Sequence, residues 1–251
     1  MLENYLATHL IDVVALIFLC SLIYSNNILN DKRKGPFWLG TILTIIIILS
    51  QVGTMIALDG NADMRFLNII CNVLGFALTP MIPIVLIAII DVKILRVAKM
   101  LLLPSIINIF AAALSPWLGI IFYVDANNHY TRGNGFIIFM AAYAINLMIL
   151  IISTVIMGEK HNYQIRSKIT ILSVFVIVGT SIQIIIPSIY STWHCVTLTL
   201  LIYYQLLTEF DGSFDALTKL HNRAAFDNMA NKPDGKNLFP LSLWMSIISK
   251  R

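Results

Sequence analysis

Ionisable and amide side chains occur inside apolar runs long enough to cross a bilayer, where a polar group is costly unless it pairs or lines a cavity. Asp12 is the strongest single candidate, because an intramembrane carboxylate marks a functional site by default. His9 lies one turn earlier on the same helix face and is its expected partner. Side chains of this kind could bind a small polar ligand. The candidate pocket residues are Asp12, Gln51, Asn68, Asn72, Asn108, Asn146, Gln183 and His194.

With the amino end outside, most of these side chains fall in the outer halves of their helices, and Asn146 falls nearer the middle of the membrane. The pattern predicts a polar pocket that opens outward. The alternative is that each amide bonds to a neighbouring helix, at about 0.6 kcal/mol apiece. No CxxC spacing or His/Cys cluster predicts a metal site, and the three cysteines are expected to be small buried hydrophobes.

A second set of residues with definite spacing directly follows the last apolar run. Its fixed positions are Asp215, Leu217, Thr218, Leu220, Asn222 and Arg223, with Phe226 as a seventh. The string resembles D-x-L-T-x-L-x-N-R-x-x-F, the opening signature of GGDEF domains. These α/β domains are the catalytic modules of diguanylate cyclases, which join two GTP into cyclic di-GMP. The resemblance is specific over residues 215–226.

The resemblance implies structural roles for the motif. Asp215 and Arg223 would form a salt bridge that braces the turn into the domain, and Asn222 is also assigned a structural role. Asp215 also suits the N-cap of a helix from Ala216 to about Ala230. The metal ligands of the intact family, which bind Mg²⁺, lie beyond this motif. We therefore predict no catalytic residue, no metal ligand and no cofactor in this chain.

The residues after 226 contain no GGDEF string, acidic cluster or glycine-rich phosphate loop. We expect a GGDEF domain truncated after its first helix and inactive. The codons of Trp244 and Met245, TGG and ATG, contain GAT when read one base earlier, and GAT encodes Asp. A frameshift near residues 237–243 in a longer cyclase gene is one explanation, and a genuine short product is the other. Sequencing the gene from codon 230 onward separates them.

Composition and hydropathy place the elements that carry these residues. The chain is 58% hydrophobic and 12% charged, whereas soluble domains carry roughly a quarter charged residues. Seven apolar runs have about the length that a membrane helix needs. Pro80 and Pro83 are expected to interrupt the third run, and Pro104 the fourth. The runs are approximately 8–28, 37–58, 66–90, 97–116, 136–157, 168–187 and 191–207.

Fifteen of the 17 Lys and Arg residues then fall on one side of the membrane, and only Arg65 and Arg132 fall on the other. Positive residues stay cytoplasmic, so the amino end is predicted outside and the tail inside. The expected fold is an all-α, seven-transmembrane-helix bundle with a cytoplasmic remnant of an α/β GGDEF domain. The predicted parts are a transmembrane region (1–207), a connector (208–214) and the truncated domain (215–251).

The loop between the fourth and fifth runs has a pattern of its own. An aromatic and β-branched stretch around Tyr123 meets an Asp/Asn turn and then a second aromatic, which predicts a short hairpin. The segment resembles the outer loop of seven-helix sensor regions fused to bacterial diguanylate cyclases and histidine kinases. It could form a lid with Tyr123, Asp125, Tyr130 and Arg132, or an interfacial belt with Trp117, Tyr123 and Tyr130.

Together these features predict the sensor region of a diguanylate cyclase in a bacterial cytoplasmic membrane. The expected partners are the lipid bilayer, a small extracellular ligand and a second copy of the chain. The net charge of +4 reflects the loop asymmetry and requires no nucleic acid. The alternatives are a stand-alone receptor or regulator, which would co-purify with an intact cyclase, and a small transporter, which would move ligand in liposomes. A histidine kinase is disfavoured by the motif after the last run.

Overall fold

The computed structural model describes residues 2–58, 62–90, 99–160, 163–185, 191–213 and 222. Each of the seven predicted apolar runs falls on one helix or on a pair of consecutive helices. The α-helices are α1 (Leu2–Ser25), α2 (Asp31–Leu58), α3 (Arg65–Leu78), α4 (Met81–Ile90), α6 (Leu103–Leu118), α7 (Phe136–Lys160), α8 (Tyr163–Ile185) and α9 (Ser191–Gly212). Two 3₁₀ turns, η1 (Ala62–Met64) and η2 (Lys99–Leu102), precede α3 and α6.

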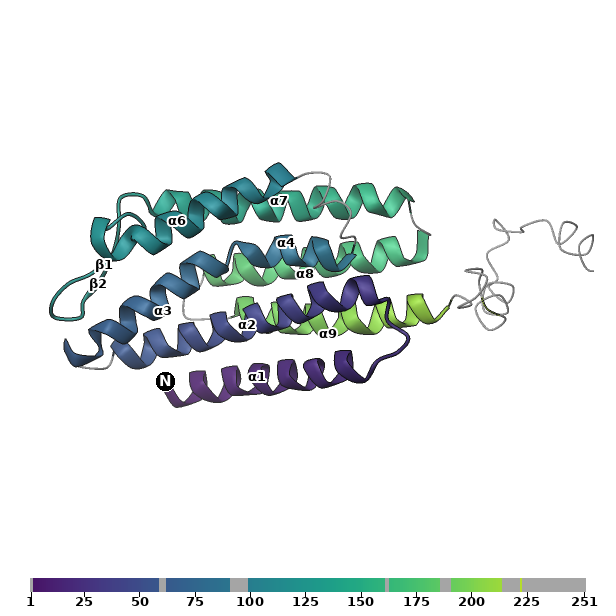
Figure 1. Ribbon diagram of the computed structural model, residues 1–251, viewed down its shortest axis with the longest axis horizontal. Coiled ribbons are helices and arrows are strands. Elements are labelled where there is room, and N and C mark those ends of the chain that lie inside the picture. The colour runs from purple at the N-terminus through teal and green to yellow at the C-terminus, as the bar shows by residue number, and fades with distance from the viewer. Residues whose placement is uncertain are drawn as a thin grey trace, which may run out of the picture.

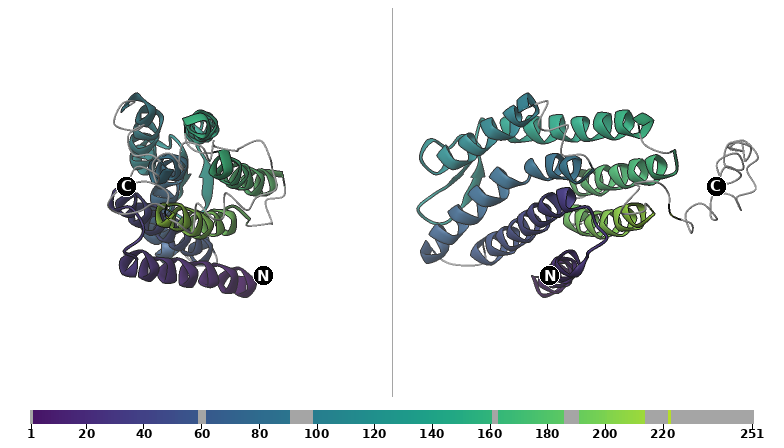
Figure 2. Two further views of the ribbon diagram at one scale, coloured as in Figure 1. Left: turned by 90° about the vertical axis from the view of Figure 1, so that its right-hand side faces the viewer. Right: turned by 45° about the vertical axis from the view of Figure 1, so that its right-hand side comes forward.

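The helices form an elongated bundle (Figure 1). α1 lies at its edge and packs against α2 and α9, while α8 contacts both α7 and α9. The other two views show the same edge position for α1 (Figure 2). The strands β1 (Phe122–Val124) and β2 (Tyr130–Arg132) lie at one end of the bundle, and the turn between α1 and α2 lies at the other.

Several helices have the length and apolar character of membrane spans. Within the described residues, four qualify by themselves, and the pair Ala62–Leu78 and Met81–Ile90, bent by 42°, would be a fifth. Many large hydrophobic side chains point away from the bundle, as lipid contact requires; Ile11 and Phe18 are 68% and 60% exposed. The fold is therefore all-α and compatible with a membrane protein, and the count of seven spans stays a prediction.

The prolines act as the sequence predicts in one place and differently in another. The third run is interrupted near Pro80, since α3 ends at Leu78 and α4 begins at Met81, but Pro83 lies within the first turn of α4 and does not interrupt it. The interruption expected at Pro104 was wrong, since α6 begins at Leu103 and Pro104 lies in its first turn. Proline is tolerated there because the first turn has no intrahelical partner for its missing N–H.

Two buried apolar clusters hold the bundle together. The larger one joins α1, α2, α4, α7, α8 and α9 through fully buried side chains such as Leu16, Phe37, Ile87 and Tyr203. The smaller one lies beneath the hairpin, where Phe122 packs with residues of α3 and α6. The hairpin is thus part of the folded core at its end of the bundle.

The predicted hairpin is confirmed. β1 pairs antiparallel with β2, so that Phe122 faces Arg132 and Val124 faces Tyr130. Asp125 Oδ1 accepts the backbone N–H groups of Asn127 and His129 at 2.9 and 2.8 Å, which closes the turn. Asn128 has a left-handed φ of 67°, a conformation that Asn adopts more readily than most residues.

At the carboxyl end, α9 continues through Gly212, so the first part of the predicted connector is helical. Of the motif residues, only Asn222 is described. Asp215, Leu217, Thr218, Leu220 and Arg223 lie outside the described residues, as does the rest of the predicted GGDEF remnant.

Candidate functional site

The main cluster of ionisable side chains inside the bundle is formed by α1 and α9. His9 and Asp12 lie one helical turn apart on α1, and His194 lies in the first turn of α9. Asp12 Oδ2 is 2.6 Å from His194 Nδ1 and 3.4 Å from His9 Nδ1. The two imidazoles stack at 5.3 Å with an angle of 21° between their planes. One carboxylate oxygen therefore faces a ring nitrogen from each helix.

Burial makes a charge on this cluster costly. His9 and Asp12 are 1% and 6% exposed, and a carboxylate removed from water needs compensating charge or hydrogen bonds. The His194 side chain is 34% exposed and links the cluster to the surface. Tyr5 packs edge-on against His9 at 4.4 Å and restricts the orientation of that ring.

The start of α9 is held closely against α8, which fixes the position of His194. The Ser191 hydroxyl donates to the Gly179 carbonyl at 2.6 Å. A Cβ at Gly179 would lie 2.3 Å from the Sγ atom of Cys195. Only a residue without a side chain allows this approach, so Gly179 is needed where α8 meets α9.

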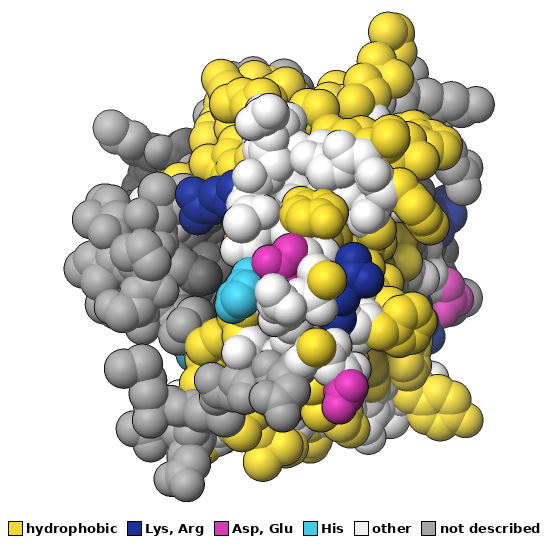
Figure 3. Space-filling model, turned by 90° about the vertical axis from the view of Figure 1, so that its left-hand side faces the viewer, with side chains coloured by type: hydrophobic (Ala, Val, Ile, Leu, Met, Phe, Trp, Pro, Cys, Tyr) yellow, Lys and Arg dark blue, Asp and Glu magenta, His cyan; other side chains and the backbone are white. Residues whose placement is uncertain are grey.

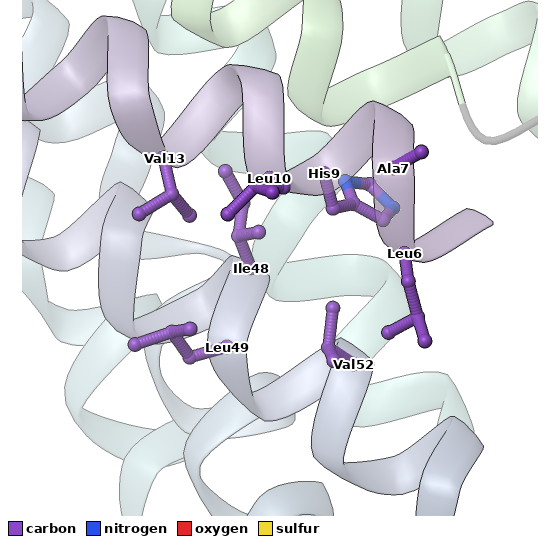
Figure 4. A pocket seen from close by; sticks show the side chains of 8 residues that line it. All are labelled: Leu6, Ala7, His9, Leu10, Val13, Ile48, Leu49 and Val52. Carbon is purple, nitrogen blue, oxygen red and sulfur yellow. The ribbon is translucent and has the colours of Figure 1, made fainter. Parts of the chain in front are cut away.

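An apolar groove of about 290 Å³ lies between α1 and α2 beside this cluster (Figure 4). His9 contributes the ring that lines the groove, and the other lining side chains are aliphatic. The groove therefore suits an apolar occupant, and His9 is the member of the cluster that lines it. Its remaining lining residues are Leu6, Ala7, Leu10, Val13, Ile48, Leu49 and Val52.

A second polar group connects α3 to the hairpin. Asn68 Nδ2 donates to Asn128 Oδ1 at 2.8 Å, and Asn72 Nδ2 donates to Asn68 Oδ1 at 2.7 Å. Asn128 Nδ2 in turn donates to the Ala57 carbonyl at the end of α2. All three asparagines are buried. These amides join α2, α3 and the hairpin turn.

The remaining amides of the predicted pocket are placed separately. Asn108 Nδ2 donates to the Phe76 carbonyl at 2.7 Å, and Asn146 Nδ2 donates to the Pro80 carbonyl and to Ser105 Oγ. Gln51 is half-buried on α2, and the side chain of Gln183 on α8 lies outside the described atoms. Among the residues described, Asp12 and His194 come together, Asn68 and Asn72 come together, and Asn108 and Asn146 bond to other helices.

The predicted lid residues lie at the end of the bundle that carries the hairpin. Figure 3 shows acidic, basic and histidine side chains near the middle of this face, bordered by hydrophobic ones. Arg65 Nε donates to the Asp125 carbonyl at 2.7 Å and so ties the hairpin to α3. Tyr130 stacks on Phe122 at 6.3 Å, Arg132 lies over the Phe136 ring, and Tyr123 is 44% exposed.

Hydrogen bonds from the turn perturb the one carboxylate of the hairpin. The pKa of Asp125 lies below its ordinary value, mainly because the carboxylate accepts a hydrogen bond from the backbone N–H of His129. Partial desolvation opposes this shift. The His129 ring and the Asn127 N–H also lower the pKa. Burial raises the pKa of Tyr130. Asp125 thus serves the turn as an ionised acceptor at neutral pH.

At the opposite end of the bundle, α9 is joined to the turn between α1 and α2. Asn26 Nδ2 donates to Tyr204 Oη at 2.7 Å, and the Tyr204 hydroxyl donates to the Leu22 carbonyl. Asp211 Oδ2 accepts the Asn30 N–H at 2.9 Å and lies 3.8 Å from Arg33 Nε. We call this set of contacts, made by Asn26, Asn30, Arg33, Tyr204 and Asp211, the inner clamp.

The sequence predicted that His9 pairs with Asp12 and placed Asp12 and His194 in one pocket, but it did not predict the direct contact between Asp12 and His194. The i,i+3 spacing of His9 and Asp12 is a local signal, and the structure pairs them. His194 was included in the predicted pocket because it is also near the predicted outer end of its helix. What the sequence lacks is the packing of α1 against α9. No family model matches the chain, and no curated protein or solved structure matches it.

Proposed function

We propose that this chain is the sensor region of a membrane-bound diguanylate cyclase, followed by the start of its GGDEF domain. The observation that carries the proposal is the string Asp215–Phe226, which resembles the opening of GGDEF domains and directly follows α9. In this proposal α9 is the helix that passes a change in the membrane to the catalytic domain.

The contacts of Asn222 support a direct connection between α9 and the motif. Its Nδ2 donates to the Gly212 carbonyl at 2.8 Å, and its backbone N–H donates to the Ser213 carbonyl at 2.9 Å. Gly212 is the last residue of α9 and Ser213 directly follows it, a position where backbone acceptors have no intrahelical partner. The motif asparagine therefore caps α9, so a displacement of this helix would also move the motif.

The contacts at the two ends of α9 support its role as the moving element. Its first turn contacts α1 through His194 and Asp12. Its last turns contact the region between α1 and α2 through the inner clamp. Both sets are polar and localised, and such contacts can exchange partners more readily than a packed apolar face. A ligand that alters the first set could shift α9 against α1.

The proposal includes a bacterial cytoplasmic membrane, a small extracellular ligand and a homodimer. Two GTP-loaded domains must face each other to form cyclic di-GMP, so the parent enzyme would act as a pair. A stand-alone membrane receptor is the alternative function, in which the same bundle would act through another protein.

A fusion tests the proposal. Residues 1–222 are joined to a complete GGDEF domain so that the motif is continuous, and cyclic di-GMP is measured in cells at matched expression. We expect Asp211→Ala, which opens the inner clamp, to change the cyclic di-GMP level by about threefold or more, the effect of a coupling free energy near 0.7 kcal/mol.

The control for this fusion is Asp31→Ala. Asp31 is the first residue of α2, next to Asn30 of the inner clamp, but its side chain is 92% exposed and pairs only with Lys34 among the contacts described. It should leave the level unchanged. Equal output from the parent fusion, Asp211→Ala and a fusion that lacks residues 1–190 would show that the bundle does not control the domain.

A further inference from the structure

The cluster of His9, Asp12 and His194 presents the donor atoms of a transition-metal site. Each residue offers one ligand atom, and the three atoms all lie within 4.8 Å of one another. We propose that these side chains bind one divalent first-row transition-metal ion, with Zn²⁺ the best match, between α1 and α9. The site stands on these three residues and does not depend on the proposed cyclase function.

The separations suit an ion bound at zinc distances. Ligand atoms about 2.1 Å from a tetrahedral ion are about 3.4 Å from each other, and His9 Nδ1 is 3.4 Å from Asp12 Oδ2. The 2.6 Å contact between His194 and Asp12 would have to lengthen by roughly 0.8 Å to reach the same spacing. His194 has room to rotate because its side chain is 34% exposed.

The arrangement of the two imidazoles favours an ion over a simple ion pair. One imidazolium would neutralise the Asp12 carboxylate through a single N–H. The second imidazole, nearly parallel to the first, places its Nδ1 3.4 Å from the same oxygen. A buried ion pair does not require that second ring, whereas a metal ion uses all three donors.

The donor set selects among metals. Ca²⁺ and Mg²⁺ prefer oxygen ligands, so a site with two imidazoles disfavours them. Imidazole with a carboxylate suits Zn²⁺ and other late first-row ions. Three protein ligands leave a fourth position open for water or a small anion. The exposed edge of His194 provides the entry path that such a site needs.

An ion here would also fix one helix to another. His9 and Asp12 belong to α1 and His194 to α9, so the metal would cross-link the two elements near the start of α9. Tyr5, edge-on to His9, would keep the ligand ring in place, as outer-shell groups do in metal sites.

The test uses the full chain, purified in detergent with an affinity tag that contains no histidine. Bound zinc is counted by mass spectrometry after dialysis, and Co²⁺ is titrated as a visible-light probe that Zn²⁺ displaces. We expect one ion per chain. His9→Gln, Asp12→Asn and His194→Gln should each weaken binding at least about tenfold.

The matched control is His129→Gln. His129 also faces an aspartate at 3.2 Å, but its side chain is 75% exposed on the hairpin. It should bind Zn²⁺ like the parent chain. Absence of Zn²⁺ and Co²⁺ binding, or equal binding by the cluster variants, would overturn the proposal.

Substitution by another ligand guards against loss of folding. His194→Cys keeps a donor for zinc, so it should retain the ion and add a thiolate-to-cobalt charge-transfer band in the near ultraviolet. His9→Cys repeats the test from α1. If both variants bind cobalt and neither shows the new band, the metal lies elsewhere.

Discussion

At the scale of single residues, the polar side chains of the bundle divide into those that join helices and those that can bind something else. Asn68, Asn108 and Asn146 each donate to a group on another element. Such bonds give a partner to amide NH2 groups, which would be costly to leave unpaired in an apolar environment. The histidines and the carboxylate between α1 and α9 are different, because one ligand atom from each lies within 4.8 Å of the other two.

Asn128 illustrates how much one residue that joins several elements can contribute to stability. It is 4% exposed, has a left-handed φ and connects α2, α3 and the hairpin. Asn128→Ala should lower the free energy of unfolding by about 2 kcal/mol, because the buried Ala57 carbonyl loses its donor and Asn68 loses an acceptor. Unfolding by SDS in mixed micelles measures the loss.

The neighbouring Asn127 provides the control for this prediction. Its side chain is exposed, and its described bond to Asp125 comes from the backbone N–H. Asn127→Ala should change the free energy of unfolding by less than about 0.5 kcal/mol. Equal losses for the two variants would mean that the buried amide contributes nothing of its own.

Asp125 gives the hairpin a predictable response to acid. Its folded pKa is lowered, so its contribution to stability is present above the unfolded value of about 3.9 and is lost as the pH falls through the folded pKa. The amides of Asn127 and His129 should therefore be protected from hydrogen exchange at pH 6 and lose protection, after correction for intrinsic rates, below about pH 4. Asp125→Asn should remove this dependence; the same acid response in the variant would assign it to another group.

At the scale of elements, hydropathy predicted the helices well because burial in lipid needs only length and apolarity. The hairpin was predictable from its Asp/Asn turn flanked by β-branched and aromatic residues. The start of α6 was not, since a proline can either break a helix or begin one. The sequence placed Asp12 and His194 in one predicted pocket, but their direct contact was not predictable, because it depends on which helices become neighbours.

The contact between α8 and α9 yields a prediction about helix packing. Gly179→Ala would place a methyl group against Cys195 and should destabilise the bundle by about 1–3 kcal/mol through overpacking. Gly75 on α3 is the matched control, since a Cβ there meets nothing within 4 Å. Gly75→Ala should be neutral or stabilise by up to about 1 kcal/mol through helix propensity. SDS unfolding of both variants would show an equal effect if backbone propensity alone decided the outcome.

At the scale of the whole molecule, the fold has two chemically different ends. The hairpin closes one end, and the turn between α1 and α2 lies at the other (Figure 1). Arg65 and Arg132 belong to the hairpin end, whereas Lys32, Arg33 and Lys34 belong to the opposite one. Positive residues are retained in the cytoplasm, so this distribution favours a hairpin outside the cell and an inner clamp within it.

Thiol labelling tests that orientation. Asn127→Cys in the hairpin turn and Lys32→Cys at the start of α2 are introduced singly into a chain whose three native cysteines are replaced by alanine. Both positions are exposed, so access depends on the side of the membrane. In intact spheroplasts, a membrane-impermeant maleimide should label the cysteine at position 127 at once. It should label the cysteine at position 32 only after the membrane is permeabilised. Labelling of both before permeabilisation would exclude two ends on opposite sides of the membrane. The reverse order would contradict the predicted orientation, since it would place the hairpin in the cytoplasm.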